Sequence, residues 1–436
     1  MTPRVVVTGM GWITPLGHDL ETVWTKLVNG ESGVRPIVRF DASTFPTSFA
    51  AEVRDYDFRK YVRNPAMHEG AAMNTQFALG AARQAWDQSG LGSYDALEPR
   101  RIGMYLGAGE GVLDFAAYAS VAMKTWDPDA GRVDTVAWAR EAAATMDRRG
   151  EIGQEPNMPL SHLAREFGIR GPACNCLTAC AASTQAIGEA VDILRRGDAD
   201  VMISGGTHTM IHVLGVTGFI RLTALSRQGG DCTRAARPFD RRRSGFVMGE
   251  GAGMVVLETL EHAEKRGAVP LAEIVGYGSS ADAFRITDMH PQGLGPAAAI
   301  IDALNQAGLD PHALGEDGRP LVHYISAHGT GTKENDSVET LAIKHVFGAN
   351  ARRIPISSIK SMMGHLIAAA GAVELITCIL AIRHKTLPPT VNLDSPDPEL
   401  DLDYVPNVAR KAEIEVCLSD SFGFGGQNDT LVVRKI

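Results

Sequence analysis

Cys180 is the residue of this 436-residue chain best suited to nucleophilic chemistry. It lies in the run LTACAAS (177–183), where a strand-like stretch gives way to a helix of small residues. The free N–H groups and the dipole at a helix start favour a thiolate, which is the reactive form of cysteine. A lone buried cysteine is more often a small apolar residue, and we interpret Cys174 and Cys176 in that way. A catalytic Cys180 therefore needs partners elsewhere in the chain.

Two histidines have settings that could supply those partners. His328 follows a strand-like stretch in SAHGTGT (326–332), whose glycines allow close approach of a ligand and whose threonines can bond to it. His365 follows KSMMG (360–364) at the start of a long apolar helix, where the dipole favours a neutral ring. Two neutral imidazoles aimed at one oxygen would stabilise an enolate.

A third segment, SFGFGGQN (421–428), is too rich in glycine for a regular strand and too apolar for an exposed loop. This composition indicates either a mobile loop whose backbone approaches the substrate or a tight turn packed in the core.

Short β-branched runs alternate with Ala-rich helical patterns along the chain, which predicts an α/β protein with a predominantly parallel sheet covered by helices. The expected strands are 5–8, 102–106, 201–204, 271–275, 322–326 and 354–358. The strand, turn and helix around Cys180 are repeated around His365, so the chain resembles an internal duplication. We expect halves at 1–268 and 269–436, with an inserted helical segment at about 111–160.

Composition excludes several classes of function. A formal charge of -9 argues against nucleic-acid binding. The six cysteines do not make a disulfide framework and lack zinc spacing, so we expect reduced thiols, no metal and no cofactor. The apolar stretch 366–382 carries Glu374, which favours a buried helix over a membrane span. The first residues leave no room for a secretory signal, so we expect a cytoplasmic protein.

Four ordered segments carry a resemblance to a known family: TAC (178–180), HGTGT (328–332), KSMMGH (360–365) and GFGG (423–426). They resemble the signature segments of the β-ketoacyl-[acyl-carrier-protein] synthases of the elongating synthase II type. The resemblance extends over nearly the whole chain. It implies a thiolase-like fold, in which duplicated βαβαβαββ halves form five layers, α-β-α-β-α.

The resemblance also implies a reaction and roles for residues. Cys180 would take an acyl group from acyl carrier protein, with its own N–H and that of Phe424 as the oxyanion hole. His328 and His365 would promote decarboxylation of malonyl carrier protein, and the product would be a 3-oxoacyl thioester. The remaining implied roles are a buried charged pair (Lys360 and Glu339), substrate contacts (Thr330, Thr332, Phe424, Phe219 and Glu110), and a homodimer or a heterodimer with a related subunit.

The sequence departs from the family in three places. The stretch 64–73 lacks the usual basic residues that dock the carrier protein, so Arg63, Arg221, Arg234 and the run 241–243 are the alternative cations. Glu110 replaces an apolar or small residue at the bottom of the acyl pocket, which suggests a short, polar or unsaturated chain, or a contact across the subunit interface. His208 and Asp420 replace the commoner Glu and Asn. The substitutions at 110, 208 and 420 suggest specialised fatty-acid or polyketide synthesis rather than ordinary fatty-acid synthesis, and repacked structural positions are an equally good explanation of them.

Three other functions share some of these features. A degradative thiolase has a second reactive cysteine, and Cys417 lacks that context. A non-catalytic chain-length partner subunit lacks the nucleophile that Cys180 provides. A cysteine hydrolase would release acid without needing malonyl units, so the mass of the product separates it from a synthase.

Overall fold

The structure, a computed structural model, describes residues 2–436. Within them ten strands form one large sheet. In spatial order these are β12 (Ile356–Ser357), β11 (Tyr324–Ser326), β15 (Val416–Gly423), β16 (Gln427–Arg434), β10 (Ala272–Ala281), β1 (Val5–Ile13), β9 (Gly251–Thr259), β8 (Val201–His208), β4 (Ile102–Ala108) and β7 (Ala173–Cys176). Short strand pairs lie outside it: β2 (Arg35–Pro36) with β3 (Phe49–Ala50), β5 (Trp126–Asp127) with β6 (Arg132–Val133), and β13 (Thr386–Leu387) with β14 (Arg410–Lys411).

The large sheet is two five-stranded halves joined through a short antiparallel contact between β1 and β10. Numbered within each half along the chain, the strands follow the same order, 3-2-4-5-1. This shared order is the internal duplication that the sequence suggests. β4 is parallel to both of its neighbours in the sheet, and so is β11. The other neighbouring strands of the sheet pair antiparallel.

The prediction of a predominantly parallel sheet is therefore wrong. Helical crossovers produce the parallel pairs, whereas β15 and β16 are joined directly by residues 424–426 and must run antiparallel. What matters for the site is that β7, β4 and β8 form one parallel group and β12, β11 and β15 form another. Side chains that follow these strands gather at the carboxyl ends of the two groups.

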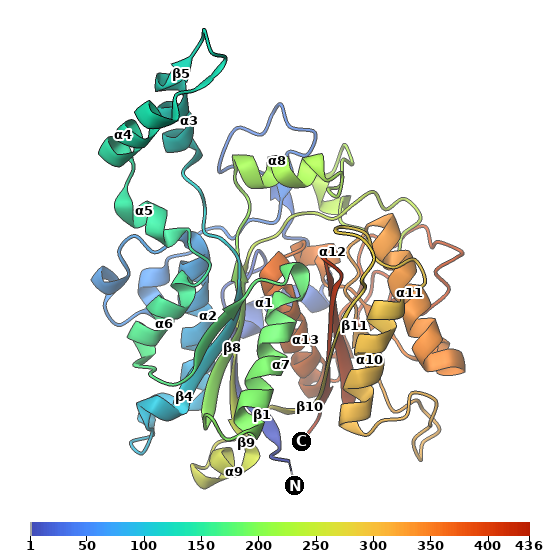
Figure 1. The fold of residues 1–436 in the computed structure, drawn as a ribbon. Helices are drawn as coiled ribbons and strands as arrows, with labels where there is room; N and C mark the ends of the chain where they lie inside the picture. The colour runs from blue at the N-terminus through green and yellow to red at the C-terminus, as the bar shows by residue number, and fades with distance from the viewer. Residues whose placement is uncertain (1) are drawn as a thin grey trace.

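The helices cover both halves and fill the space between them (Figure 1). Their bounds are α1 (Leu20–Val28), α2 (Met73–Ser89), α3 (Phe115–Lys124), α4 (Thr135–Thr145), α5 (Arg148–Gly153), α6 (Met158–Phe167), α7 (Ala182–Arg195), α8 (Val213–Arg221), α9 (Leu260–Lys265), α10 (Leu294–Ala307), α11 (Lys333–Phe347), α12 (Lys360–Met363) and α13 (Ala370–His384). Helices α7 and α13 pack against each other between the two half-sheets, with α2 on one outer face and α10 and α11 on the other.

Helix α13 is a core element. The stretch Ile367–His384 is long and apolar enough to cross a membrane by length and composition, but 89% of it is buried inside the protein. This burial supports the prediction of a buried helix, because a membrane span presents its apolar side chains outward to lipid.

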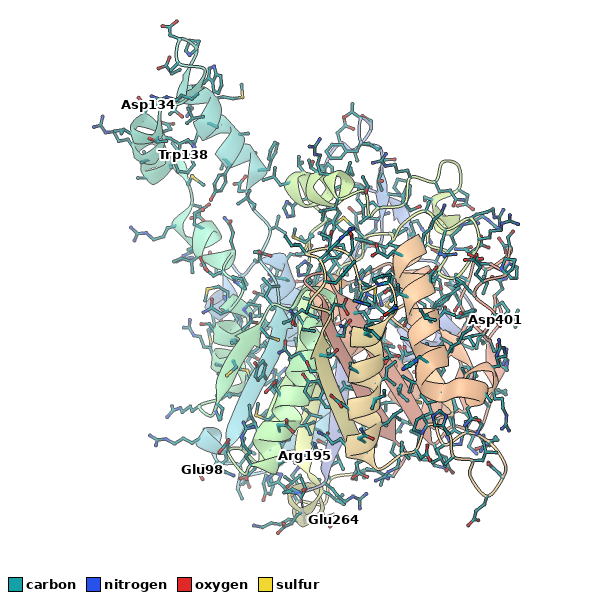
Figure 2. The ribbon with its side chains drawn as sticks, turned by 45° about the vertical axis from the view of Figure 1, so that its right-hand side comes forward. Glu98, Asp134, Trp138, Arg195, Glu264 and Asp401 are labelled. Atoms are coloured by element: carbon teal, nitrogen blue, oxygen red, sulfur yellow. The ribbon has the colours of Figure 1, made fainter. Side chains whose placement is uncertain are left out.

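Segment 111–157 leaves the body as an arm (Figure 1). It contains α3, the β5–β6 pair, α4 and α5, and Asp134 and Trp138 lie on it away from the sheet (Figure 2). The arm exposes several large apolar side chains, namely Met123, Trp126, Val136 and Ile152.

Candidate active site

Cys180 lies in the turn between β7 and α7, inside a 3₁₀ turn at Ala179–Ala181. Ala179 adopts a positive φ of 47°, which is unfavourable for a residue with a Cβ and brings the chain sharply from strand to helix. Ile367 has a φ of 50° at the matching turn before α13. The duplicated halves therefore share this strained turn, and one copy of it holds the cysteine.

His365 contacts Cys180 directly. Its Nε2 lies 3.0 Å from the Sγ of Cys180, and the backbone N–H of Ile367 donates to its Nδ1 at 3.2 Å. Because Nδ1 accepts, the proton of the neutral ring is on Nε2. Burial lowers the pKa of His365 well below its usual value, and Lys360 and His208 lower it further. The ring is therefore a neutral donor pointing at the cysteine.

His328 follows β11 and faces His365 edge-on, with the ring centroids 5.3 Å apart. The ammonium group of Lys360 is 3.5 Å from its Nδ1 and donates to its backbone carbonyl at 2.5 Å. A donor at Nδ1 again leaves the ring proton on Nε2. Burial, Lys360 and His365 lower the pKa of His328 well below its usual value, so this ring is also neutral.

Lys360 forms its buried ion pair with Glu374 of α13, and this corrects the pairing with Glu339 that the resemblance implies. Glu339 instead accepts the backbone N–H groups of His328 and Gly329 at 2.7 and 2.8 Å. It thereby fixes the loop that carries His328. A sequence signal for Glu374 existed, because a single carboxylate in an otherwise apolar buried helix needs a partner.

More carboxyl groups than cations are buried beside the histidines. Burial raises the pKa of Glu339 to about 8, and the nearby Asp420 raises it as well. Burial also raises the pKa of Asp420 to about 7, with Glu374 adding to the shift, while the hydroxyl of Thr430 donates to Asp420 at 2.7 Å. Lys360 is thus shared by a group of acids that cannot all be ionised at neutral pH.

The backbone around Cys180 offers the donors of an oxyanion hole. The backbone N–H groups of Phe424 and Cys180 lie near enough to the Sγ to lower the pKa of the thiol. Gly423 fits against this turn because a Cβ there would lie 3.1 Å from both the Cys180 nitrogen and the Thr178 carbonyl oxygen. The segment 421–428 is therefore a strand end and tight turn packed on the nucleophile.

The helix start does not by itself hold Cys180 as a thiolate. Burial raises the pKa of the Cys180 thiol to about 11, although Lys360 and the Phe424 N–H act in the opposite direction. Only 8% of Cys180 is exposed, so a thiolate there would lose most of its hydration. The free site therefore holds a neutral thiol between neutral imidazole donors.

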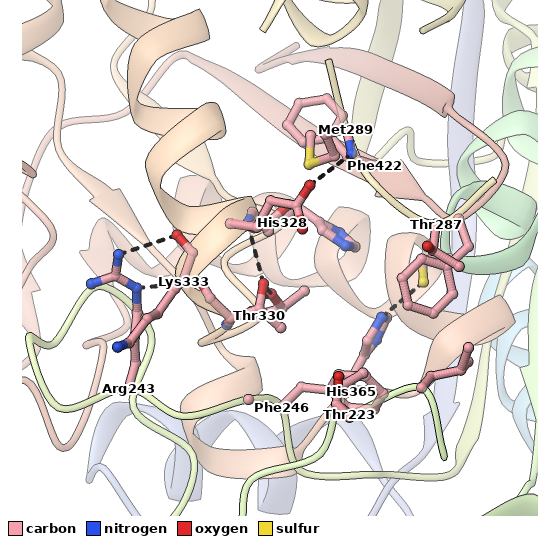
Figure 3. Close-up of a pocket in the computed structure, with 18 of the residues that line it drawn as sticks. Thr223, Arg243, Phe246, Thr287, Met289, His328, Thr330, Lys333, His365 and Phe422 are labelled. Atoms are coloured by element: carbon pink, nitrogen blue, oxygen red, sulfur yellow. Dashed lines mark hydrogen bonds between the residues drawn. The ribbon is translucent and has the colours of Figure 1, made fainter. Parts of the chain in front are cut away.

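A cavity of about 740 Å³ opens onto these groups. Cys180, His328 and His365 lie on its wall, together with Thr330, Thr332, Phe219 and Phe424. Figure 3 shows His328 and His365 directed into the same space from different segments of the chain. The threonine hydroxyls are 2.9 Å apart, so they form one polar patch on the cavity wall. The sequence did not identify Phe246 or Phe422, whose rings pack against His365 and His328.

Glu110 does not line the cavity of Cys180. It follows β4 and lines a second cavity of about 410 Å³ at the base of the arm, with its side chain exposed in the single chain. The sequence could not place this residue, because the path of the chain after β4 depends on how the arm packs.

The nitrogen and sulfur atoms of Cys180, His328 and His365 lie within 4.8 Å of one another, a spacing that a metal ion could bridge. A metal would need the Nε2 lone pair on both rings. The contacts to Nδ1 place the proton on Nε2 in each case, so the hydrogen-bond network opposes metal binding and favours donation to an oxygen.

The comparisons with known proteins agree with this geometry. The family profile "Beta-ketoacyl synthase, N-terminal domain" matches residues 2–263, and "Beta-ketoacyl synthase, C-terminal domain" matches residues 271–394. The chain is 41% identical to a 3-oxoacyl-[acyl-carrier-protein] synthase 2 of Coxiella burnetii over 99% of both chains. It is 40% identical to the protein of that name from Synechocystis, over 99% of this chain and 98% of the relative.

Two solved structures align with this chain over the full length of both chains. The ishigamide ketosynthase/chain length factor has a TM-score of 0.85 at 34% identity. A β-ketoacyl synthase from Burkholderia phymatum has a TM-score of 0.86 at 30% identity. With the duplicated halves, the buried cysteine and the paired histidines, these likenesses establish that the chain belongs to the β-ketoacyl synthase family of condensing acyltransferases.

Proposed function

We propose that Cys180, His328 and His365 carry out a decarboxylative condensation of an acyl group with malonyl carrier protein, giving a 3-oxoacyl thioester. One observation carries this assignment: a buried thiol lies beside two neutral imidazoles whose Nε2–H groups face one cavity, with two backbone N–H groups at the sulfur. Donors held in that way match the negative oxygen that forms in each half of the reaction.

In the first half, the sulfur of Cys180 attacks the carbonyl carbon of an acyl thioester. The carbonyl oxygen becomes negative between the N–H groups of Cys180 and Phe424, which lie near the sulfur. The carbon–sulfur bond to the carrier then breaks, and the proton of the Cys180 thiol ends on the carrier thiol. An acyl-Cys180 thioester and a free carrier result.

In the second half, the carbon–carbon bond to the malonyl carboxylate breaks and carbon dioxide leaves. The electron pair moves onto the thioester oxygen, where the Nε2–H groups of His328 and His365 stabilise the enolate. The enolate carbon attacks the acyl-Cys180 carbonyl, and the sulfur leaves. The Cys180 thiolate takes up a proton from water, and the acyl chain has grown by two carbons on the malonyl carrier.

Lys360 and Glu339 hold the histidine side of the site in this proposal. The ammonium of Lys360 fixes the ring proton of His328 on Nε2, and Glu339 anchors the same loop through the backbone. Both act through His328, so they are positioning residues. Thr330 and Thr332 at the mouth would hold the carrier's arm.

We propose that the partner is an acyl carrier protein, docked at the mouth of the main cavity. One solved relative, at 32% identity and a TM-score of 0.84, is a ketosynthase in complex with a type II polyketide synthase acyl carrier protein. Arg234, Arg242 and Arg243 are engaged by aspartates, which leaves Arg241 and Lys333 as cations lining the mouth. These two would meet the acidic carrier.

A second copy of the chain is proposed to pair along β7. This strand ends the sheet, and Ala173 and Cys174 on it are exposed. An exposed edge with free backbone groups is a template for pairing with a second copy around a two-fold axis. The apolar arm of the same half would then cover the partner. The cysteines are free thiols in residues 2–436, which supports a reducing compartment such as the cytoplasm.

The deciding experiment is intact-mass analysis of the wild type and Cys180→Ala after incubation with acyl carrier protein, followed by malonyl carrier protein. The wild type should gain one acyl group and lose it when malonyl carrier yields a 3-oxoacyl product, while the variant gains none. Release of free acid instead would identify a hydrolase, and absence of any loading on the wild type would identify a chain-length partner subunit.

A further inference from the structure

Two histidines outside the condensing site face each other at the base of the arm. His68 ends a 3₁₀ turn at Pro65–His68, and His162 lies on α6, which packs against α2 below the arm (Figure 1). Their Nδ1 atoms are 3.0 Å apart. The cysteine spacing that argues against zinc does not bear on this pair, because the two histidines are 94 positions apart in the sequence.

The contacts of His68 hold its ring in the form that binds a metal ion. Its Nε2 lies 3.0 Å from Oε2 of Glu166, and a carboxylate only accepts, so Nε2 carries the proton. The lone pair of the neutral ring is then on Nδ1, the atom that faces His162. A carboxylate at the far nitrogen supports many histidine ligands, because it fixes the tautomer and makes the ring more basic.

Glu166 is itself held in place as an ionised group. Its Oε1 accepts from the guanidinium of Arg83 at 2.5 Å and from the backbone N–H of Arg63 at 3.0 Å. Burial opposes ionisation, but the hydrogen bonds from His68, Arg63 and Arg83 together lower the pKa of Glu166. Glu166 follows His162 one turn later on α6, so one helix face supplies a ring and the supporting carboxylate.

His162 can become the second ligand without a change of charge. Burial lowers its pKa to about 4, and His68 and Arg165 lower it further, so the ring is neutral at neutral pH. While Nδ1 of His68 accepts, the proton of His162 is on its own Nδ1. Metal binding needs that proton on Nε2, and this change of tautomer leaves the ring neutral.

The spacing of the two nitrogens fits a divalent transition metal. Zinc bonds to histidine nitrogens at about 2.0 to 2.1 Å in tetrahedral sites, which places two such nitrogens about 3.3 Å apart. The observed 3.0 Å is within a small ring rotation of that distance. His68 is fully buried and His162 is partly exposed, so water can complete the coordination from the side of His162.

We propose that His68 and His162 bind one zinc ion, with Glu166 as the carboxylate that orients the ring of His68. The ion would join the segment 64–72 to α6. The site is separate from Cys180 and takes no part in the condensation.

The segment 64–72 connects this site to the arm. Glu69 forms an exposed ion pair with Arg149 of α5, and a Cβ on Gly70 would lie 3.3 Å from the Cβ of Arg149. An ion held between His68 and α6 would therefore restrict the joint between the body and the arm.

The test measures Zn²⁺ binding at neutral pH by isothermal titration calorimetry. All proteins carry Cys180→Ala, so that the thiol of the condensing site does not compete for the ion. The variants in this background are His162→Gln, Glu166→Gln and the matched control His345→Gln, at an exposed histidine on α11. Thermal unfolding without metal confirms that each variant is folded.

The background protein and His345→Gln should bind one Zn²⁺ ion that His162→Gln binds about a hundredfold more weakly. Glu166→Gln should bind it about tenfold more weakly, the cost of losing a group that supports a ligand. Mg²⁺ should give no binding signal, because it prefers oxygen ligands to imidazole. Equal numbers of bound Zn²⁺ ions and equal affinities in His162→Gln and the background protein overturn the proposal.

Hydrogen–deuterium exchange measures the effect on the joint. Zn²⁺ should slow exchange in residues 64–72 of the background protein and of His345→Gln, and it should leave exchange in His162→Gln unchanged. Exchange in 64–72 that is the same with and without bound Zn²⁺ in the background protein overturns the restriction of the joint.

Discussion

In each histidine of the site, a donor bound at Nδ1 places the ring proton on Nε2. For His365 that group is the backbone N–H of Ile367, which leaves Nε2–H for the substrate oxygen. Glutamine places an amide N–H near the position of Nε2, whereas asparagine places one near Nδ1. His365→Asn should therefore lower kcat by about 10² to 10³, the effect of removing one oxyanion donor. His365→Gln should lose about ten times less.

Single-turnover condensation with pre-loaded acyl-Cys180 enzyme measures this difference without the loading step. Thermal unfolding of both variants serves as the control for packing against Phe246, whose ring centroid is 5.2 Å from that of His365. Equal losses, or a more active asparagine variant, would mean that the proton lies on Nδ1 and that the imidazole acts in another way.

At the scale of elements, the turn before α7 and the end of β15 must fit within tenths of an ångström. Gly423→Ala should lower the rate of acyl transfer to Cys180, because the new Cβ would lie 3.1 Å from the Cys180 nitrogen and displace an oxyanion donor. A loss of about 10² fits the removal of such a donor. Stopped-flow loading of acyl carrier protein measures it.

Gly229→Ala is the matched control, since a Cβ at that exposed position meets nothing within 4 Å. It should load acyl groups at the wild-type rate. If Gly423→Ala also loads normally, the Phe424 N–H does not bind the acyl oxygen, and the tight contact with the Cys180 turn is only a matter of packing.

At the scale of the whole molecule, the buried acids connect the site to stability. Burial raises the pKa of Asp420 to about 7, while the unfolded chain has the ordinary value of 3.8. Between these values the folded state binds the extra proton, so this group makes folding less favourable as pH rises from about 4 to 7. Asp420→Asn should remove that dependence and raise the free energy of unfolding at pH 8 by roughly 4 kcal/mol.

Urea unfolding at pH 6 and pH 8 gives, for the wild type and for Asp420→Asn, the change in the free energy of unfolding between the two pH values. Asp302→Asn, at an exposed position on α10, should leave the slope with pH as it is in the wild type. If the free energy of unfolding of Asp420→Asn depends on pH as strongly as that of the wild type, Asp420 is ionised in the folded protein.

The proposed dimer is a second property of the whole molecule. Cys174→Lys would place like charges on two β7 edges facing each other across a two-fold axis, and like charges directly opposite each other are destabilising. Light scattering should show twice the chain mass for the wild type and a single chain mass for the variant. Leu314→Lys, at an exposed apolar position far along the sequence, should stay dimeric. A dimeric Cys174→Lys would place the interface elsewhere.

The residues that can do the chemistry, and their positions after strand ends, are recognisable from the amino-acid sequence alone. Cys180, His328 and His365 are recognisable because each stands in a short run of small residues and glycines after a strand, and such turn chemistry is a local property. The assignment of the family and of the fold class followed from the same runs. The boundary at 268/269 stays a prediction.

The charge states and ion pairs of these residues depend on the folded structure. The partner of Lys360 is Glu374 and not Glu339, the thiol of Cys180 is protonated, and Glu110 lines a different cavity. Each outcome depends on which groups from distant parts of the chain exclude water from a side chain. Desolvation and ion pairing are set by this non-local packing, and local sequence patterns do not contain it.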